Sequence, residues 1–362
     1  MMNTLNSANL DSHKGRPYTP KNKRLTLWQP SDNFLHCCIE SRGCRFSIQH
    51  GSCVMCDYGI GKNLIASELE KALEDHLLPR LKNIKTVLFG SYGSVFDEYE
   101  ISDECFDIIL NFLSKHTVDN IIFETHYSTV NVQKLKRIKK SLSESCEISI
   151  EMGYESCDEY ILLNCLGKVM DLNKLQNTIN EIHSEGMKAT LNVFLGAPFI
   201  SVQDQTLSSV RSIEWAFQNG ADFIVIFPSN IKPFTLLHSL YLSGNYSEIS
   251  HWQIIDVLNR IPVEFLNKVS LSWYGDRENF YENNEFPLIP PKACEKCHNP
   301  VFSFYRDFHS TKNSSERKNL LKDLLDYDPG CICRETYSRD YNIDKKRLSL
   351  KQIKELVENE RL

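Results

Sequence analysis

The sequence predicts an α/β fold, a partial (β/α)6 barrel followed by a small cysteine-rich C-terminal module. Short β-branched runs alternate with amphipathic helical stretches through the middle of the chain, which is typical of a parallel sheet covered by helices. A proline-rich joint, F-P-L-I-P-P-K, then precedes a tail with two close pairs of cysteines. With 362 residues, the chain can bury a sizeable core without help from disulfides.

Three segments follow from this pattern. Residues 1–26 are polar and rich in Asn, Ser, Lys and Pro, and we expect them to form a mobile N-terminal arm. Residues 27–285 should form the barrel. Residues 286–362 should form the cysteine-rich module and a closing helix.

Six strand and helix units are expected in order along the barrel. The strands are expected at 35–40, 86–89, 120–124, 147–152, 188–194 and 223–227. The helices are expected at 66–82, 103–115, 132–142, 172–186 and 205–220, with a further helix at 252–260 and a last strand at 268–276. Since crossovers between parallel strands are right-handed, the sheet should curl in one direction, with its functional residues at the carboxyl ends of the strands.

The cysteine content favours a reducing compartment. Thirteen cysteines in so long a chain do not resemble the staples of a small secreted protein, and the N-terminus M-M-N-T-L-N-S has no apolar signal core. No stretch of the sequence approaches about 20 consecutive apolar residues. We therefore expect a cytoplasmic protein without a membrane span. Cys37 and Cys38, in the apolar strand F-L-H-C-C-I-E, are expected to be core residues.

The charge balance gives no general attraction to phosphate backbones. The net charge is -6, and the pI is near 6.0. Basic runs occur at 134–140 and 345–347, and on helices such runs usually form solvated faces.

The loop R-G-C-R-F-S-I-Q-H-G-S-C-V-M-C-D-Y-G holds Cys44, Cys53 and Cys56 between the first strand and the first helix. An ordinary [4Fe-4S] site uses four thiolates, one for each iron, whereas this loop supplies three. A cluster on three thiolates leaves one iron open, and an open position marks a reactive metal site. Zinc with His50 or His36 as the fourth ligand is the alternative for this spacing.

A three-cysteine loop in this position resembles the radical S-adenosylmethionine (SAM) superfamily. The resemblance implies a [4Fe-4S] cluster on Cys44, Cys53 and Cys56, with the amino and carboxylate groups of SAM on the open iron. It also implies a partial barrel of the radical SAM type, and cleavage of SAM by one electron to a 5′-deoxyadenosyl radical.

The second strand ends in L-F-G-S-Y-G-S-V-F-D, where glycines expose the backbone of a turn. In radical SAM enzymes this turn contacts the amino group of SAM. The resemblance therefore makes Gly90, Ser91 and Gly93 candidate cofactor-binding residues. A turn that needs glycine only for positive φ is the alternative.

Three carboxylates lie at or just beyond strand ends, namely Glu124, Glu151 and Glu155. A carboxylate that faces a barrel interior is costly unless another group bonds it. The ribose and the methionyl amine of SAM suit Glu151 and Glu155, and Glu124 suits either SAM or the substrate. An internal ion pair with Lys168 or Arg42 is the alternative.

The fifth and sixth strands end in N-V-F-L-G-A-P-F and I-F-P-S-N. Gly196 and Pro198 are expected to shape the adenine side of the SAM site. Ser229 and Asn230 are expected at the mouth of the barrel as substrate contacts.

The C-terminal module carries two cysteine pairs, C-E-K-C with Cys294 and Cys297, and C-I-C-R-E with Cys331 and Cys333. Four thiols in two close pairs predict a structural metal site. Zinc and a second iron-sulfur cluster are both open as its occupant, because C-x-C is tighter than the usual zinc spacing.

The ordered motifs together resemble a narrower family. The three-cysteine loop, G-S-Y-G-S-V-F-D, E-M-G-Y-E-S, L-G-A-P-F-I-S and the terminal cysteine pairs look like the radical SAM subunit of archaeosine synthase, which is related to elongator-type radical SAM proteins. That family, with a partner transferase, splits a C–N bond in a lysine adduct of a 7-deazaguanine in tRNA. This chain departs from the family pattern where its third strand closes in E-T-H-Y and where S-G-N-Y-S interrupts the late helices.

We therefore expect a radical SAM enzyme that abstracts hydrogen from an amine-bearing substrate, either a modified nucleobase or a small metabolite. A lyase-like C–N cleavage or a rearrangement would follow. The expected partners are a reductant protein such as flavodoxin or ferredoxin, and tRNA. The alternative function is a catalytically inactive zinc-binding interaction protein in a nucleic-acid-modifying complex.

Overall fold

One sheet of eight strands organises the chain. The structure is a computed structural model that describes residues 2–12, 24–58, 61–116, 118–272, 288–327, 330–343 and 347–359. The strands lie in the sheet in the order in which they occur in the sequence. The first pair is antiparallel and the later pairs are parallel. This order is that of a partial (β/α) barrel, so the predicted fold class is confirmed.

The strands are β1 (Leu25–Ser31), β2 (Phe34–Ile39), β3 (Thr86–Ser91), β4 (Asn120–Thr125), β5 (Glu147–Glu155), β6 (Lys188–Leu195), β7 (Phe223–Pro228) and β8 (Val269–Leu271). The α-helices are α1 (Met2–Ser12), α2 (Arg45–His50), α3 (Ala66–Ala72), α4 (Asp103–Lys115), α5 (Val132–Ser141), α6 (Leu172–Ser184), α7 (Val202–Gln218), α8 (Leu236–Leu242), α9 (His251–Arg260), α11 (Glu295–Ser310), α12 (Ser314–Asp326), α13 (Ile332–Tyr341) and α14 (Leu350–Asn359). Shorter helical turns are η1 (Leu73–Leu77), η2 (Leu78–Arg80), η3 (Tyr127–Thr129), η4 (Ile161–Leu166) and η5 (Val263–Lys268).

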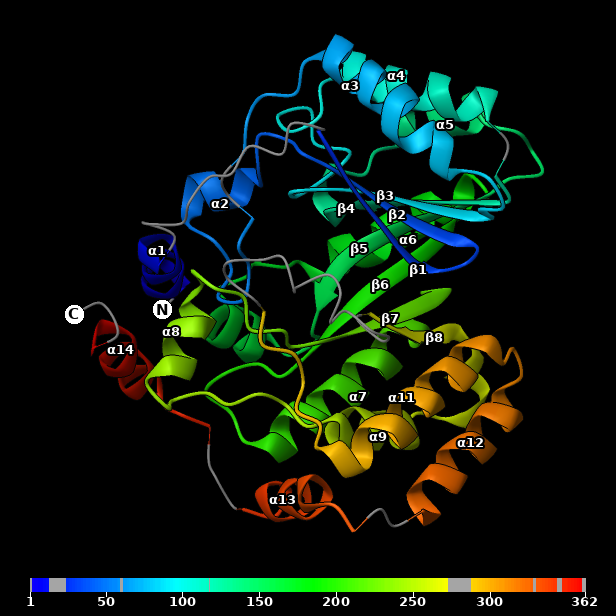
Figure 1. The fold of residues 1–362 in the computed structure, drawn as a ribbon. Coiled ribbons are helices and arrows are strands. Elements are labelled where there is room, and N and C mark those ends of the chain that lie inside the picture. Colours follow the sequence, from blue (N-terminus) through cyan, green and yellow to red (C-terminus); the bar gives the residue numbers. More distant parts are fainter. Residues whose placement is uncertain are drawn as a thin grey trace.

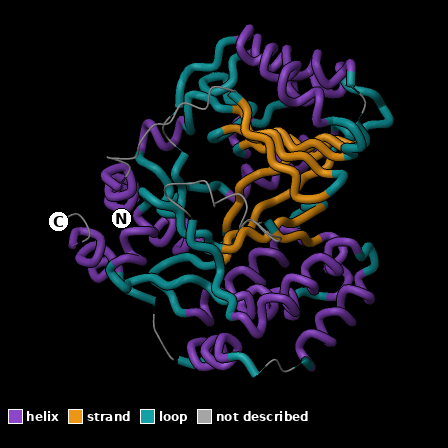
Figure 2. The backbone as a smooth tube through the Cα atoms, in the orientation of Figure 1, coloured by secondary structure: helices purple, strands orange, loops and turns teal. Residues whose placement is uncertain are grey.

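Helices cover the outer side of the sheet. Figure 1 shows α3, α4 and α5 along one part of it, and α7, α9 and α11 along another. The strands form an inner layer between these two groups (Figure 2). A third group, α1, α2, α8 and α14, gathers beyond the carboxyl ends of the strands, and α1 contacts each of the other three helices.

The two faces of β2 differ in burial, because successive side chains of a strand point to opposite faces. Leu35, Cys37 and Ile39 of β2 are fully buried in the main core beneath the helices. His36 and Cys38 point to the opposite, inner face and are only partly buried. The prediction that both neighbouring thiols are core residues is therefore confirmed for Cys37 alone.

All six predicted barrel strands are present, and two more join them. β1 pairs antiparallel with β2 at one edge of the sheet and was not predicted. β8 pairs with β7 and matches the start of the predicted last strand. The rest of that prediction, from residue 273 onward, lies outside the described residues.

The N-terminal segment differs from the predicted mobile arm. Residues 2–12 form α1, in which Leu5 and Asn6 are fully buried, and β1 already begins at Leu25. The segment has few apolar residues, so its composition resembles that of a solvated arm. The Nδ2 groups of its buried asparagines, Asn6 and Asn9, instead donate hydrogen bonds to carbonyls of the chain beneath them.

The C-terminal helices pack onto the barrel's own core. Cys297, Val301 and Phe308 of α11 and Leu321 of α12 are fully buried in the same apolar cluster as the strands. α13 contacts α7 and α9. Among the described residues, no helix has both the length and the apolar character needed to cross a bilayer.

Candidate cofactor site

The three-cysteine loop leaves the carboxyl end of β2. Cys44 is the N-cap residue of α2, and Cys53 and Cys56 follow that helix. Gly43 and Gly51 flank the helix with φ angles of 104° and 85°, in the left-handed region that glycine adopts without strain. The Cys56 N–H donates to the carbonyl of Cys53 at 2.8 Å, so these two cysteines share one tight turn.

The three thiols lie close enough to affect one another's ionisation. Burial raises the pKa of Cys44 to about 12, and the neighbouring Cys56 adds to the rise. Burial also raises the pKa values of Cys53 and Cys56. The Tyr58 N–H donates to the Cys56 sulfur at 3.3 Å. Thiols with raised pKa values keep their protons at neutral pH unless a metal replaces them, so the donor set fits an iron-sulfur cluster.

The turn after β3 lies directly against this loop. A Cβ atom on Gly93 would be 2.8 Å from the Cα of Cys44 and 2.4 Å from Oε1 of Glu100, so the position has room for glycine alone. The Ser91 hydroxyl donates to Glu100 at 3.4 Å, and the Ser94 N–H donates to it at 2.8 Å. Two of the predicted turn residues, Ser91 and Gly93, therefore lie beside the cysteine loop.

Glu100 is a site neighbour that the sequence did not single out. It is 4% exposed, and burial raises its pKa to about 7, although N–H donors from Ser94 and Arg45 lower it. The Arg45 N–H reaches its carboxylate at 3.3 Å. Glu100 thus ties the β3 turn to the start of α2, a contact between residues that no local spacing links.

Glu124 and Glu151 lie opposite each other on neighbouring strands β4 and β5. A Cβ atom on Gly90 would be 2.6 Å from Oε2 of Glu124, so this carboxylate covers the first glycine of the β3 turn. Burial raises the pKa of both carboxyls, and Glu151 raises that of Glu124 further. Asn192 hydrogen-bonds Glu151, while the Asn192 Oδ1 atom is buried without a partner among the described residues. Such a group suits a ligand with hydrogen-bond donors.

Glu155 has an internal partner instead. Lys168 Nζ lies 2.9 Å from its Oε1 and also donates to the carbonyl of Gly153 at 2.8 Å. The alternative of an ion pair with Lys168 therefore holds for Glu155. Arg42, the other partner considered, has its guanidinium 4.4 Å from the centre of the Tyr99 ring. Glu155 itself has a φ of 67°, an uncommon conformation for a non-glycine residue at a strand end.

Two lysines supply positive charge near the thiols. Lys168 lowers the pKa of Cys53 against the larger effect of burial, and Lys232 does the same for Cys56. Lys232 Nζ also bonds Asp57 at 2.8 Å. Lys232 follows shortly after β7, which ends at Pro228, whereas Lys168 comes well after β5, which ends at Glu155.

The ends of β6 and β7 meet at Gly196. This glycine has a φ of 107°, and a Cβ atom on it would be 2.8 Å from the Cβ of Ser229. The Tyr246 hydroxyl donates to the Gly196 carbonyl at 2.6 Å. Pro198 is buried in the following turn, and Asn230 is buried with its amide donating to a carbonyl two residues earlier at 2.9 Å. These residues therefore form a packed wall at this end of the sheet.

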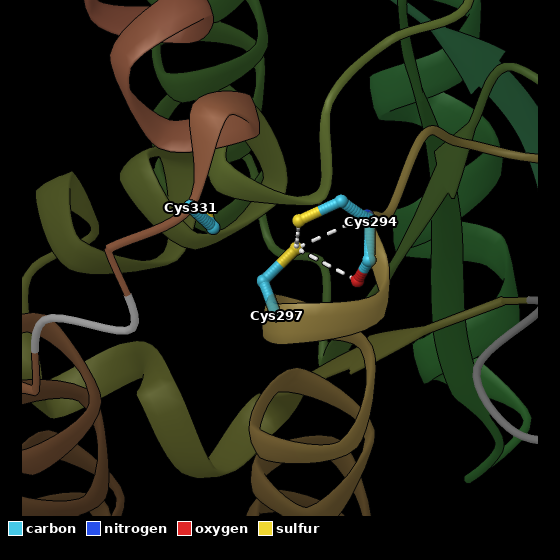
Figure 3. A group of neighbouring side chains, drawn as sticks. All are labelled: Cys294, Cys297 and Cys331. Carbon is cyan, nitrogen blue, oxygen red and sulfur yellow. Dashed lines mark hydrogen bonds between the residues drawn. The ribbon is translucent and has the colours of Figure 1, made fainter.

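The four C-terminal thiols come together although the two pairs lie far apart in the sequence. Sγ of Cys294 is 3.5 Å from Sγ of Cys297, and these two atoms and Sγ of Cys331 all lie within 4.8 Å of one another (Figure 3). Cys333 hydrogen-bonds both Cys294 and Cys297. Cys294, Cys297 and Cys331 can together hold a metal ion, whereas Cys333 as a fourth ligand stays a prediction.

The thiol of Cys294 ionises more readily than an ordinary cysteine. Cys294 and Cys331 are the N-cap residues of α11 and α13. Burial raises the pKa of Cys294, but hydrogen bonds from Cys297, Cys333 and the Lys296 backbone together lower it to about 6. Burial raises the pKa of Cys297 to about 12. A thiolate is the form that binds a metal ion.

A curated relative supports the resemblance drawn from the motifs. Archaeosine synthase subunit beta from Methanosarcina acetivorans is 24% identical to this chain over 352 residues, covering 90% of this chain and 92% of that protein. The resemblance inferred from the ordered motifs is therefore confirmed over most of the chain. No family model matches the sequence.

Several solved structures are similar to this chain. Elp3 from Methanocaldococcus infernus, with an N-terminal deletion, is 14% identical with a TM-score of 0.45, covering 67% of this chain and 58% of that structure. Methylornithine synthase (PylB) is 13% identical with a TM-score of 0.47, covering 88% and 91%. The radical SAM methyltransferase TsrM from Kitasatospora setae is 10% identical with a TM-score of 0.47, covering 86% and 65%. The chain thus spans less than two thirds of the Elp3 and TsrM structures.

Proposed function

We propose that this chain is a radical SAM enzyme whose [4Fe-4S] cluster is held by Cys44, Cys53 and Cys56. The loop geometry carries the proposal: three partly buried thiols from one strand-to-helix connection lie close enough to affect one another's ionisation, at the carboxyl ends of parallel strands. A cluster on three thiolates keeps one iron open for a further ligand. The similarity to archaeosine synthase subunit beta supports the same assignment.

When bound, the cluster and SAM together supply a 5′-deoxyadenosyl radical that abstracts hydrogen from the substrate. The chain's own residues bind SAM and orient it. Lys168, whose ammonium is held by Glu155 near Cys53, suits the SAM carboxylate. The backbone of the β3 turn at Gly90, Ser91 and Gly93 suits the SAM amino group.

Buried carboxylates would hold the rest of SAM. Among the described residues, no cationic side chain hydrogen-bonds Glu124 or Glu151. Ribose hydroxyls or an ammonium group of SAM would therefore offset the cost of burying these carboxylates. Glu155 acts through Lys168 in this scheme. Gly196 and Pro198 would form the adenine side, because a side chain at Gly196 would fill the space beside Ser229.

The substrate class is inferred from the relative and from the site. The name of archaeosine synthase subunit beta supports a modified nucleobase as substrate, tRNA as its carrier, and a second subunit as partner. We infer a lyase-type C–N bond cleavage, with Ser229 and Asn230 as substrate contacts and a flavodoxin or ferredoxin as reductant. The thirteen cysteines are all free, which supports a reducing cytoplasm.

We infer that the C-terminal thiols hold zinc. Zn–S bonds of about 2.3 Å place the sulfurs of a tetrahedral site about 3.8 Å apart. The 3.5 Å between Cys294 and Cys297 supports one shared ion. A cubane would place each thiolate on a separate iron and spread the sulfurs farther apart.

Anaerobic reconstitution of the full chain with iron and sulfide tests the cluster. We expect about four irons and four sulfides per chain, and an electron paramagnetic resonance (EPR) signal of the reduced cluster that changes when SAM is added. The combined Cys44→Ala, Cys53→Ala and Cys56→Ala variant should lose both. Cys37→Ala, a buried thiol on the outer face of β2, is the matched control.

A reduced signal that does not respond to SAM, or equal iron content in the triple variant, would contradict the proposal. A wild-type chain that takes up zinc alone would favour the inactive zinc-binding interaction protein instead.

A further inference from the structure

Helix α1 packs directly on the cysteine loop. Leu5 and Ala8 are buried in one apolar cluster with Val54, which lies between two of the loop cysteines. The approach is close: a Cβ atom on Gly51 would lie 2.3 Å from the backbone carbonyl oxygen of Asn6. The same cluster includes residues of α8 and α14, and Figure 1 shows these helices together with α1. The loop is therefore covered by the N-terminal helix.

The Asn6 side chain anchors α1 to the base of the loop. It is fully buried, and its Nδ2 donates to the carbonyls of Gly51, Ser52 and Gly167 at 3.1, 3.2 and 2.9 Å. None of these three residues is a candidate ligand. Asn6 thus fixes where the helix sits.

Asn9, one turn later on α1, contacts the cysteines themselves. It is also fully buried, and its Nδ2 donates to the carbonyl of Cys53 at 3.0 Å and to that of Cys56 at 3.1 Å. Its Oδ1 accepts the Leu236 N–H at 2.5 Å. One amide group therefore joins the backbones of two candidate ligands to the start of α8.

The amide of asparagine suits this arrangement. The two loop carbonyls accept hydrogen bonds, and the Leu236 N–H donates one, so the residue between them must offer both a donor and an acceptor. Holding the carbonyl of a residue restricts its ψ angle and hence the direction of the neighbouring chain. Outer-shell hydrogen bonds of this kind fix the orientation of metal ligands.

We propose that Asn9 is a positioning residue for the cluster, and that α1 acts through it to hold Cys53 and Cys56 at the spacing the cluster requires. The inference rests on the proposed function, because it assumes that these thiols bind iron. It goes beyond that function by giving the N-terminal helix a role in cluster retention, although α1 supplies no ligand.

Asn9→Asp tests the proposal. Aspartate keeps the size and the acceptor for the Leu236 N–H, but it loses the donors and places a carboxylate against two carbonyls. We expect the reconstituted variant to release iron to a chelator about 10- to 100-fold faster than the wild type. We also expect shifted EPR g-values for its reduced cluster. Asn9→Ala, which removes the donors without adding charge, is the second variant should Asn9→Asp fail to fold.

Two control variants separate positioning from general packing. Ser7→Ala changes the exposed face of α1 and should release iron at the wild-type rate. Leu5→Ala loosens the packing of α1 but leaves the Asn9 hydrogen bonds in place. If α1 only stabilises the fold, Leu5→Ala and an Asn9 variant of equal thermal stability will release iron equally fast.

The outcomes are distinct. A wild type that forms no SAM-responsive cluster would overturn the proposed function, and this inference with it, before any variant is compared. A wild type with a normal cluster and Asn9 variants that release iron no faster than Leu5→Ala would overturn the positioning role alone. Faster release confined to the Asn9 variants, with altered g-values, would support it.

Discussion

Glu151 lies beside a second buried carboxylate on the sheet. It is 4% exposed, opposes Glu124 across the β4–β5 pair, and hydrogen-bonds Asn192. Burial raises its pKa, so the charged form is costly unless a ligand donates to it. If SAM supplies hydrogen-bond donors to Glu151, the cost of burying the charged carboxylate is offset only when SAM is bound.

Glu151→Gln should therefore weaken SAM binding. The amide keeps the size of the side chain but loses the charge that strengthens a hydrogen bond, which is worth about 1 to 3 kcal/mol. Calorimetric titration of the cluster-loaded protein with SAM measures the change. Glu147→Gln, at the exposed start of the same strand, is the control and should bind SAM normally. Unchanged affinity combined with lower thermal stability would instead indicate that Glu151 has a structural role.

His251 should make the folded protein less stable in acid. It is 6% exposed and its Nδ1 bonds the Tyr305 hydroxyl at 2.9 Å. Burial lowers its pKa to about 4, against an unfolded value near 6.5. The folded state therefore holds the neutral ring. The free energy of unfolding is therefore unaffected by His251 above pH 6.5. It falls by about 3 kcal/mol as the pH drops from 6.5 to 4, because the unfolded state binds the proton first.

His251→Gln should reduce the change in the free energy of unfolding between pH 6.5 and pH 4.5. The test is the free energy of unfolding in denaturant, measured from pH 7.5 to pH 4.5 for the wild type and the variant. His76→Gln, at a less buried histidine of η1, should leave the wild-type slope in place. An equal slope in the wild type and His251→Gln would show that His251 does not cause it.

The sequence predicted some residues of the candidate site and missed others. Cys44, Cys53 and Cys56 are found by spacing because all their partners lie within one loop. Asn9 reaches that loop from 44 and 47 residues away, so no local pattern marks it. Lys168 was identified from the sequence, but only as an ion-pair partner. Its proximity to the cysteines follows from how the loops after β2 and β5 meet.

At the scale of elements, the succession of β-branched runs and amphipathic helical stretches was the reliable signal. Strands β2 to β7 carry apolar residues on the helix-covered face, and each was predicted close to its observed bounds. α1 was missed because its buried face includes asparagines, which composition counts as solvent-exposed. The hydrogen bonds that make their burial acceptable appear only in the folded chain.

The C-terminal thiols predict a local effect of metal loss. Cys331→Ser combined with Cys333→Ser should remove about one zinc per chain, because two of four ligands are lost. α13 begins at these residues, so hydrogen exchange should quicken in α13 while the N-terminal cluster keeps its absorbance. Cys146→Ser is the control, because Cys146 belongs neither to the three-cysteine loop nor to the C-terminal thiols.

A different result would reassign that group. Loss of about four irons and four sulfides on the same substitution would show a second cluster at these cysteines. Retention of all metal would show that the four thiols only pack together.

At the scale of the whole molecule, the order of strands could be predicted and the closure of the site could not. When every right-handed crossover moves the chain to the next strand on the same side, the strands lie in chain order, which is the order observed. The helices that close the end of the barrel, α1, α8 and α14, come from three distant parts of the chain. Their meeting depends on the apolar cluster around Leu5, Leu237 and Ile353, which no periodicity in the sequence reveals.

Formation of 5′-deoxyadenosine from SAM by the whole chain decides whether this site performs radical chemistry. The reconstituted protein is reduced with dithionite under anaerobic conditions, and the product is quantified by chromatography and mass spectrometry. We predict product from the wild type and from Cys37→Ala, and none above background from Cys44→Ala, Cys53→Ala or Cys56→Ala. Product from those three variants at the wild-type rate, or none from a wild type with a complete cluster, would contradict the assignment.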